Sequence, residues 1–287
     1  MKKIVFVFSM ALSFYANAWE PCGEDDNGDT ANCEYKIENG TLTIRGTGNN
    51  GNIGYWDTNY APWYGKNVQN VVIEDTIKDL GWFGFYGVKS QNALEIPSSV
   101  TTISRNAFFG ADIKEVIIPD SVSKIDTAAF NWSSLKKINI PSSVTDIAEA
   151  FRGTSLTDVF IPDSVTNLGS ATLSACESLL TLTISDKTAL GHIFTEPGEN
   201  MRVDLENLKI YCTGDTAKCD ANLEAAGYPD LKSSKATTKQ INGVTYVYDK
   251  NGKLVTSSGH RSEKRIYTID EANQVAGARN RVSIKYR

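Results

Sequence analysis

The pentapeptide IPDSV occupies Ile118–Val122 and occurs again at Ile161–Val165. Its variant IPSSV occupies Ile96–Val100 and Ile140–Val144. Successive copies begin 21 or 22 residues apart. Self-similarity at a period of this size predicts a solenoid, in which each repeat forms one coil and stacks on its neighbours.

Other apolar positions repeat in step with the proline. A valine follows the isoleucine by four residues in every copy, and a large apolar residue follows it by eleven or twelve, at Phe108, Phe130, Phe151 and Leu173. Weaker copies begin at Ile73 and Ile184, each 23 residues from its neighbour. Such degraded copies fit a solenoid's end coils, which must present a polar face to water.

Within one repeat the pattern predicts short extended pieces. The stretch IKEVIIP, from Ile113 to Pro119, alternates apolar and polar residues and ends in proline, which is typical of a half-buried strand that stops there. The stretch SVTTI (Ser99–Ile103) predicts a turn and a second extended piece. RNAF (Arg105–Phe108) predicts a short helical turn that points its phenylalanine inward.

These offsets together resemble the BspA-type leucine-rich repeats of bacterial surface proteins, with their pattern IPxSVxxIxxxAFxxxxLxxVx. The resemblance runs from about Tyr35 to about Ile210 and includes YKIENGTLTIRGTGN at its start and APWY at Ala61–Tyr64. It implies a β-rich leucine-rich-repeat solenoid, here about five to six coils with short strands and short helical turns. It also implies an exported protein associated with adhesion to other proteins or cells.

The first residues predict a secretory signal peptide. Two lysines precede an apolar run from Ile4 to Tyr15, and Ala16-Asn17-Ala18 forms a small-x-small cleavage site before Trp19. The run is shorter than the roughly 20 residues that span a bilayer. We therefore expect an exported protein, at the cell surface, secreted or periplasmic, with no integral membrane segment after cleavage.

The chain then divides by composition. We expect a signal peptide at 1–18, an N-terminal cap segment at 19–72, the solenoid with its C-terminal cap at 73–219, a polar linker at 220–240 and a small β-rich basic module at 241–287. The formal net charge of −5 argues against nucleic acid as a partner, because phosphate binding needs a clustered positive face.

The C-terminal module contains a predicted β-hairpin. VTYVY (Val244–Tyr248) and KLVT (Lys253–Thr256) flank an Asn251-Gly252 turn, which supplies the positive φ angles of a tight hairpin. Residues 265–277 predict a strand running into a short helix, and 281–287 a final strand.

The tail of this module is basic, whereas the body is acidic. It is either an ordinary solvated surface or an electrostatic anchor to an acidic envelope polymer or partner. The basic residues are Arg261, Lys264, Arg265, Arg279, Arg281, Lys285 and Arg287.

An oxidising compartment favours disulfides among the five cysteines. Local pairing of Cys22 with Cys33 and of Cys212 with Cys219 is the simplest assignment, although four cysteines allow three pairings. Zinc is the rival, but neither pair is CxxC and no histidine lies close by. Cys176 lies between apolar repeat positions and is expected to be a buried free thiol.

The sequence carries no catalytic motif, so we expect a protein that is not an enzyme and uses no cofactor. It lacks HExxH, GxSxG and a P-loop, and neither His192 nor His260 has a supporting context. EDDNGD (Glu24–Asp29) resembles a calcium loop, but if Asp25 takes position one, position twelve is Lys36 instead of the required glutamate. A turn inside a disulfide loop is favoured there.

Aromatic residues gather before the first clear repeat. They either fill the end of the solenoid, which is the favoured interpretation, or form a platform for sugars or peptides. The cluster is Tyr55, Trp56, Tyr60, Trp63, Tyr64, Trp82, Phe83, Phe85 and Tyr86.

The predicted strands place a candidate binding surface on the solenoid. In IKEVIIP, Ile113, Val116 and Ile118 are expected to face inward, with Glu115 and Ile117 outward. The same offsets give two outward columns that we expect to bind a protein or cell-surface ligand: Glu115, Lys137, Asp158 and Thr181, and Glu95, Ile117, Asn139, Phe160 and Thr183.

Two apolar members of these columns, Ile117 and Phe160, break the polar rule of an outward face and are a candidate contact centre. The alternative is that both pack against the C-terminal module. The sequence thus predicts an exported binding or adhesion protein. The other interpretation is a structural envelope protein anchored by its basic module.

Overall fold

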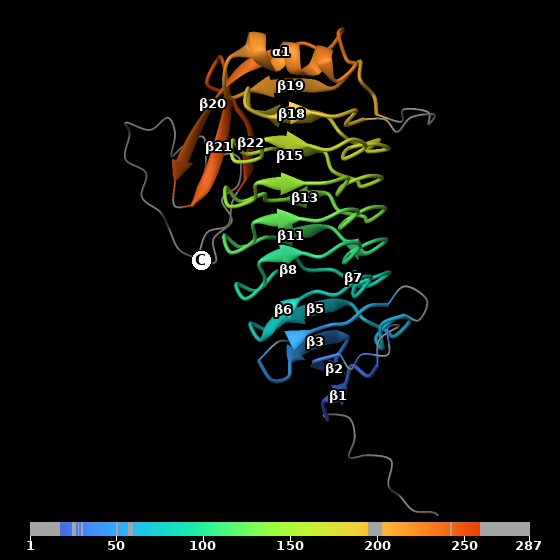
Figure 1. The fold of residues 1–287 in the computed structure, drawn as a ribbon. Helices are drawn as coiled ribbons and strands as arrows, with labels where there is room; N and C mark the ends of the chain where they lie inside the picture. The colour runs from blue at the N-terminus through green and yellow to red at the C-terminus, as the bar shows by residue number, and fades with distance from the viewer. Residues whose placement is uncertain are drawn as a thin grey trace, which may run out of the picture.

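The structure, a computed structural model, describes residues 18–24, 27, 29, 31–49, 51–56, 60–194, 203–241 and 243–258. Its coils stack in one column, from β1 at the bottom to the helix α1 at the top (Figure 1). Residues 1–17 of the predicted signal peptide (1–18) lie outside the described residues. The predicted strand, helix and final strand after residue 258, with His260 and the basic tail, also lie outside them.

The first coils form the N-terminal cap. Strands β1, β2, β3 and β5 make a four-stranded sheet in that order, antiparallel up to β3 and parallel between β3 and β5, and β4 pairs with β6. These strands are β1 Glu20–Pro21, β2 Cys33–Glu38, β3 Thr41–Gly46, β4 Gly51–Asn52, β5 Asn70–Ile73 and β6 Ile77–Asp79.

Each later coil contributes one short parallel strand to a first sheet face. This face comprises β8 Leu94–Glu95, β11 Glu115–Ile117, β13 Lys137–Ile138, β15 Asp158–Phe160, β17 Thr181–Ile184 and β19 Lys209–Cys212. Strands β8, β11 and β13 form one sheet, and β15, β17 and β19 belong to another. The half-buried strands predicted before each proline are therefore present.

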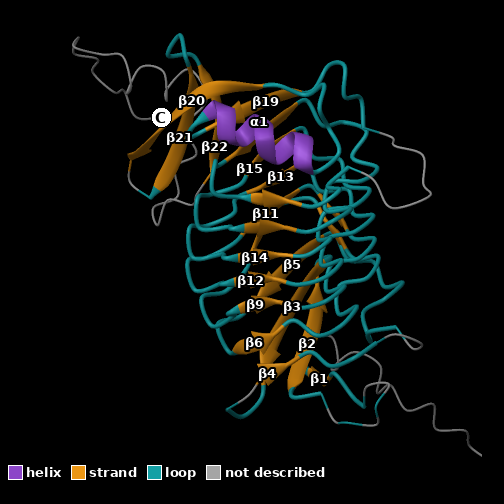
Figure 2. Ribbon diagram, turned by 45° about the horizontal axis from the view of Figure 1, so that its top comes forward, coloured by secondary structure: helices purple, strands orange, loops and turns teal. Residues whose placement is uncertain are grey.

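The predicted second extended piece of each repeat is present, and these pieces together form a second face. Its five-stranded parallel sheet runs in the order β18-β16-β14-β12-β9. Its members are β9 Thr102–Ile103, β12 Lys124–Ile125, β14 Asp146–Ile147, β16 Asn167–Leu168 and β18 Ala189–Leu190, and a separate pair joins β7 Lys89–Ser90 to β10 Asp112–Ile113. Figure 2 shows the strands of successive coils one above another.

The IPDSV motif is the corner between the two faces. In each copy the valine N–H donates to the proline carbonyl three residues earlier, as in Val122 to Pro119 at 3.1 Å. This bond closes a four-residue turn. The isoleucine and the valine of each motif are buried, so the corner is stabilised by packing against the core.

The serine of the motif ties each coil to the one before it. Ser121 Oγ donates to the Val100 carbonyl at 2.7 Å, and Ser143 Oγ donates to the Val122 carbonyl at 2.6 Å. Ser164 repeats this with Val144 at 2.6 Å. A serine is therefore repeated because its hydroxyl satisfies a corner carbonyl of the neighbouring coil.

The phenylalanines form a continuous stack through the centre. Ring centroids lie 4.8 Å apart between Phe85 and Phe108, 5.1 Å between Phe108 and Phe130, and 5.8 Å between Phe130 and Phe151. All four side chains are buried. They belong to one hydrophobic core that extends from Cys22 to Tyr228, so neighbouring coils share their interior.

The segment that carries each phenylalanine is not the helical turn predicted from RNAF. The N–H groups of Asn106, Phe108 and Gly110 donate to carbonyls of the next coil. The N–H groups between them, on Ala107 and Phe109, close turns within the coil. Asn106 also has a φ of 54°, in the left-handed region, so the segment is not a right-handed helical turn.

The C-terminal end is closed by α1, Thr216–Ala225. Asp215 is its N-cap, with a carboxylate that accepts from the Ala217 N–H at 3.0 Å. Cys219 and Leu223 are the helix's buried residues. Tyr228, just after the helix, packs edge-on against Phe194 with ring centroids 5.1 Å apart, so the core ends on an aromatic pair.

The predicted linker at 220–240 is wrong, because this stretch holds most of α1 and of strand β20, Ser233–Ile241. Its polar composition misled the prediction. The first residues of β20 pair with β19, and the rest pair with β21, which supplies backbone partners to a strand that buries only Ala236.

The predicted hairpin is confirmed. Strand β21, Val244–Asp249, pairs antiparallel with β22, Leu254–Ser258, and Gly252 in the turn has a φ of 78°. The hairpin extends the solenoid sheet into six strands in the order β15-β17-β19-β20-β21-β22. Strands β20 to β22 lie beside the upper coils in both views (Figures 1 and 2).

Candidate functional site

The first sheet face carries the predicted binding residues, and the structure divides it into two halves. The open half consists of β8, β11 and β13, together with β5 of the N-terminal cap, which lies next to β8. The covered half consists of β15, β17 and β19, whose sheet continues into the C-terminal hairpin. Glu95 and Lys137, both in the open half, are exposed, whereas Glu115 and Ile117 are half-buried.

One predicted column is a polar ladder. Glu115 lies beside Lys137 in the register of β11 and β13. Further up, Thr181 Oγ1 donates to the Asp158 carboxylate at 2.5 Å, and Thr157 Oγ1 donates to the same carboxylate at 2.8 Å. Asp158 and Thr181 are half-buried, so this column is polar along its length.

The second column carries the apolar residues. Ile117 lies beside Glu95 in the register of β8 and β11. One repeat upstream of Glu95 is Val72 in β5, with 46% of its surface exposed, and it pairs with Thr43 of β3. The sequence prediction missed Val72, although extending the column by one 23-residue period identifies it. Val72, Glu95 and Ile117 thus form an apolar-acidic-apolar strip on the open half.

Asn139 belongs to the same column, but its side chain is engaged with the backbone. Its Oδ1 accepts from the Ile118 N–H at 2.7 Å, and its Nδ2 donates to the Ile118 carbonyl at 2.7 Å. The residue therefore continues the hydrogen bonding of β11 where no strand residue does so. Its role is structural, which leaves little of the amide for a ligand.

The expected exposure of Phe160 and Thr183 is wrong, because the C-terminal hairpin covers them. Phe160 is 9% exposed and packs with Ala236 and Val247 of the hairpin, in a cluster separate from the main core. Thr183 is completely buried. The alternative that Phe160 packs against the C-terminal module is confirmed, whereas Ile117 stays outside that contact.

The hairpin also reaches the boundary between the two halves. Ser258, at the end of β22, accepts from the Ile140 N–H at 3.1 Å, and its hydroxyl lies 3.4 Å from the Ile140 carbonyl. The end of β22 thus supplies hydrogen bonds at the corner that follows β13.

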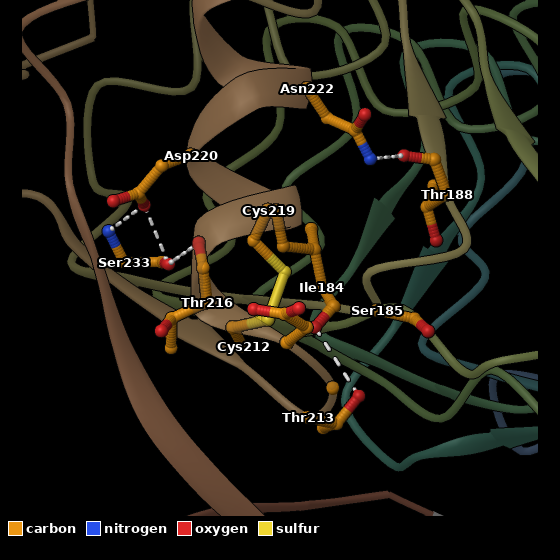
Figure 3. The surroundings of a disulfide bond; sticks show 12 residues. Ile184, Ser185, Thr188, Cys212, Thr213, Thr216, Cys219, Asp220, Asn222 and Ser233 are labelled. Atoms are coloured by element: carbon orange, nitrogen blue, oxygen red, sulfur yellow. Dashed lines mark hydrogen bonds between the residues drawn. A yellow bond between two sulfur atoms is a disulfide. The ribbon is translucent and has the colours of Figure 1, made fainter.

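A disulfide between Cys212 of β19 and Cys219 of α1 joins the last strand of the solenoid to the capping helix (Figure 3). Around it the Asp220 carboxylate accepts from both the N–H and the hydroxyl of Ser233, at 2.7 Å each. Asn222 donates to the Thr188 carbonyl at 3.0 Å. These contacts hold the start of β20 in place.

The predicted cysteine states are confirmed. Cys22 pairs with Cys33 in the N-terminal cap, and Cys176 is a buried free thiol. Burial raises the pKa of the Cys176 thiol. The thiolate is the reactive form, so Cys176 is a packing residue that also contacts Thr154 Oγ1 at 3.3 Å.

The aromatic cluster has two layers. Trp56, Trp63 and Phe85 are buried in the end of the core. Tyr60 and Tyr64 are 53% and 42% exposed and stack on each other with centroids 3.9 Å apart. The predicted filling of the solenoid's end therefore describes the inner rings only.

His192 is exposed and lies against Gly227 in the C-terminal cap. In the ranges that the structure describes, no three His, Cys, Asp or Glu side chains gather in a way that could hold a metal ion. The same ranges contain no helix with the length and hydropathy needed to cross a membrane.

Comparison with known proteins agrees with this architecture. Residues 59–185 match the family described as BspA type leucine rich repeat region, in six copies. No curated protein shows a significant match to the chain.

Several solved structures align with part of this chain. A leucine-rich repeat protein from Bacteroides ovatus ATCC 8483 aligns with 65% of this chain and 55% of its own, at 25% identity and a TM-score of 0.44. The pneumococcal vaccine antigen PcpA aligns with 77% and 53%, at 15% identity and a TM-score of 0.33. A leucine rich cell surface protein from Faecalibacterium prausnitzii A2-165 aligns with 79% and 59%, at 20% identity and a TM-score of 0.33. This chain thus spans less than two thirds of each of these proteins.

Proposed function

We propose that this chain, whose residues 59–185 are BspA-type leucine-rich repeats, is an exported protein that binds a partner protein through the open half of its first sheet face. The observation that carries the proposal is the strip of Val72, Glu95 and Ile117. Its two apolar side chains lie on an otherwise polar outward surface.

Exposed apolar groups cost free energy in water, which a bound partner would remove. An outward valine that is 46% exposed adds little to folding, yet it gains about 25 cal/mol for each Å² that a partner removes from water. Glu95 within the strip and Lys137 in the neighbouring column are exposed and carry charges of opposite sign. Charges at an interface mainly determine the orientation in which a partner binds, and they contribute less to its affinity.

Stacked repeats also give the strip a rigid support. Strand β11 pairs with β8 and β13, and β5 pairs with β3, while the side chains beneath these strands are buried in the shared core. The strip is therefore organised before binding, which reduces the entropy lost on association. Repeat proteins bind partners on extended surfaces of this kind.

The first experiment identifies the partner. The chain without residues 1–18 is immobilised and exposed separately to extracellular host proteins and to a purified bacterial envelope fraction. We expect specific retention of a soluble protein, competed by free chain. Retention by envelope polymer alone, abolished by high salt, would instead support an envelope component anchored by its basic C-terminal residues.

A further inference from the structure

The covered half of the sheet face contains an apolar contact centre of its own. Phe160 and Thr183 lie side by side in the register of β15 and β17, and Thr183 lies beside Tyr211 of β19. All three side chains face away from the main core. Phe160 and Tyr211 pack against Ala236, Val247 and Val255 of the hairpin instead.

This contact is small and imperfect. Its cluster holds three buried residues, Phe160, Ala236 and Val247, whereas the main core is continuous through every coil. Thr183 Oγ1 is buried beneath the hairpin without a hydrogen-bond partner. A buried hydroxyl with no partner costs free energy, and lifting the hairpin would return it to water.

The hairpin has the features of a unit that can move as one body. Only Ser233, Ser234 and Lys235 of β20 pair with β19, and the remaining residues of that strand pair with β21 alone. A second cluster, with Tyr246 and Tyr248 buried on the opposite face of β21, holds the three strands to one another. Its lower attachment is the Ser258 contact to the Ile140 backbone.

We propose that the hairpin β20–β22 is an autoinhibitory cover that hinges at Lys235–Ala236 and exposes Phe160, Thr183 and Tyr211 when it lifts. Lifting extends the apolar strip of the open half by one further centre in the same column. The inference rests on the proposed function, because the uncovered surface adjoins the proposed binding strip. A partner that contacts both halves binds the lifted state and shifts the population towards it.

The experiment uses an introduced thiol to report the lifting. Thr183→Cys is nearly isosteric and places a thiol beneath the cover in the full-length exported chain, whereas Cys176 in the main core serves as the internal reference. Maleimide labelling under native conditions is followed by mass spectrometry. Local opening requires less free energy than global unfolding, so we expect the introduced thiol to react at least about tenfold faster than Cys176.

A second pair of variants in the Thr183→Cys background tests the cause. Val247→Asp places a charge in the hairpin contact and should accelerate labelling of the introduced thiol while leaving Cys176 unchanged. Lys239→Asp, on an exposed position of β20, should change neither rate.

Two results would overturn the proposal. One is equal, slow labelling of the introduced thiol and Cys176, which would make the hairpin a permanent part of the folded unit. The other is acceleration of both thiols by the same factor in Val247→Asp. Neither measurement needs a partner, so failure of the cover and failure of the proposed binding function are separate results.

Discussion

At the scale of the residue, the recurrence of the IPDSV motif is explained by the corner turn that it forms. The serine before the valine of IPDSV and IPSSV recurs because its hydroxyl satisfies a carbonyl of the preceding coil, as Ser121 does for Val100 and Ser143 for Val122. The sequence shows that a serine recurs but not why, since its partner lies about one repeat away. The position before it varies between serine and aspartate in the four motifs, at residues 98, 120, 142 and 163.

The two serines of IPSSV at 140–144 offer a matched pair. Ser143→Ala removes a part-buried hydrogen bond and should lower the free energy of unfolding by about 1 kcal/mol. Ser142 is exposed, so Ser142→Ala should leave it nearly unchanged. Urea denaturation of both variants compares them, and equal effects would contradict the role assigned to the corner serine.

Backbone strain is also a residue-scale feature. Asn106, Ala128, Glu149 and Ala171 occupy the same place in successive coils, and each has a φ between 47° and 57°. Only glycine adopts this left-handed region without cost, and asparagine tolerates it better than alanine does. In this segment, alternate backbone N–H groups donate within the coil and to the next coil. This hydrogen-bonding pattern imposes a positive φ on alanine and glutamate residues, which do not favour it.

Ala128→Gly should therefore stabilise the protein, by about 0.5–1 kcal/mol after the entropy cost of glycine is subtracted. The adjacent Ala129 is buried and has no positive φ, so Ala129→Gly should destabilise it. Thermal melts of the two variants should shift in opposite directions. A lower melting temperature for Ala128→Gly would show that the strain is not relieved there.

At the scale of the element, regular strands were predictable and the segments between them were less so. Period-two alternation located β11 because alternate side chains meet the core and solvent. The helical turn predicted for RNAF was wrong because alternate N–H groups there donate to the next coil. The linker predicted from polar composition was wrong because its residues form β20, which pairs with β19 and β21. Both failures arise where backbone partners come from distant residues that local composition does not reveal.

The phenylalanine stack gives the element-scale test. Phe130 is fully buried between Phe108 and Phe151, so Phe130→Ala should lower the free energy of unfolding by about 3–5 kcal/mol. Lys136→Glu, at an exposed position of the same repeat, should be nearly neutral. Denaturant unfolding measures both, and an unchanged stability in Phe130→Ala would show that the coils do not share this core.

At the scale of the whole molecule, the solenoid presents two different surfaces on one face. The outward columns were predictable from the repeat offsets, which placed Glu95, Ile117 and Lys137 correctly on the surface. The burial of Phe160 was not decided by those offsets, because it depends on where the hairpin docks. Docking of one element on another depends on tertiary contacts between residues far apart in the sequence, here Phe160 with Ala236 and Val247.

At this scale, the proposed partner protein contacts the strip on the open half. The most direct measurement is the affinity of the isolated partner for the double variant Val72→Ser/Ile117→Ser, determined by titration calorimetry. Leu180→Ser, which removes a 55% exposed leucine outside the two columns, is the matched control. We expect the double variant to lose at least about tenfold in affinity, which is about 1.4 kcal/mol, and the control to keep wild-type affinity. Undiminished affinity in a folded double variant would contradict the claim and place the binding site elsewhere.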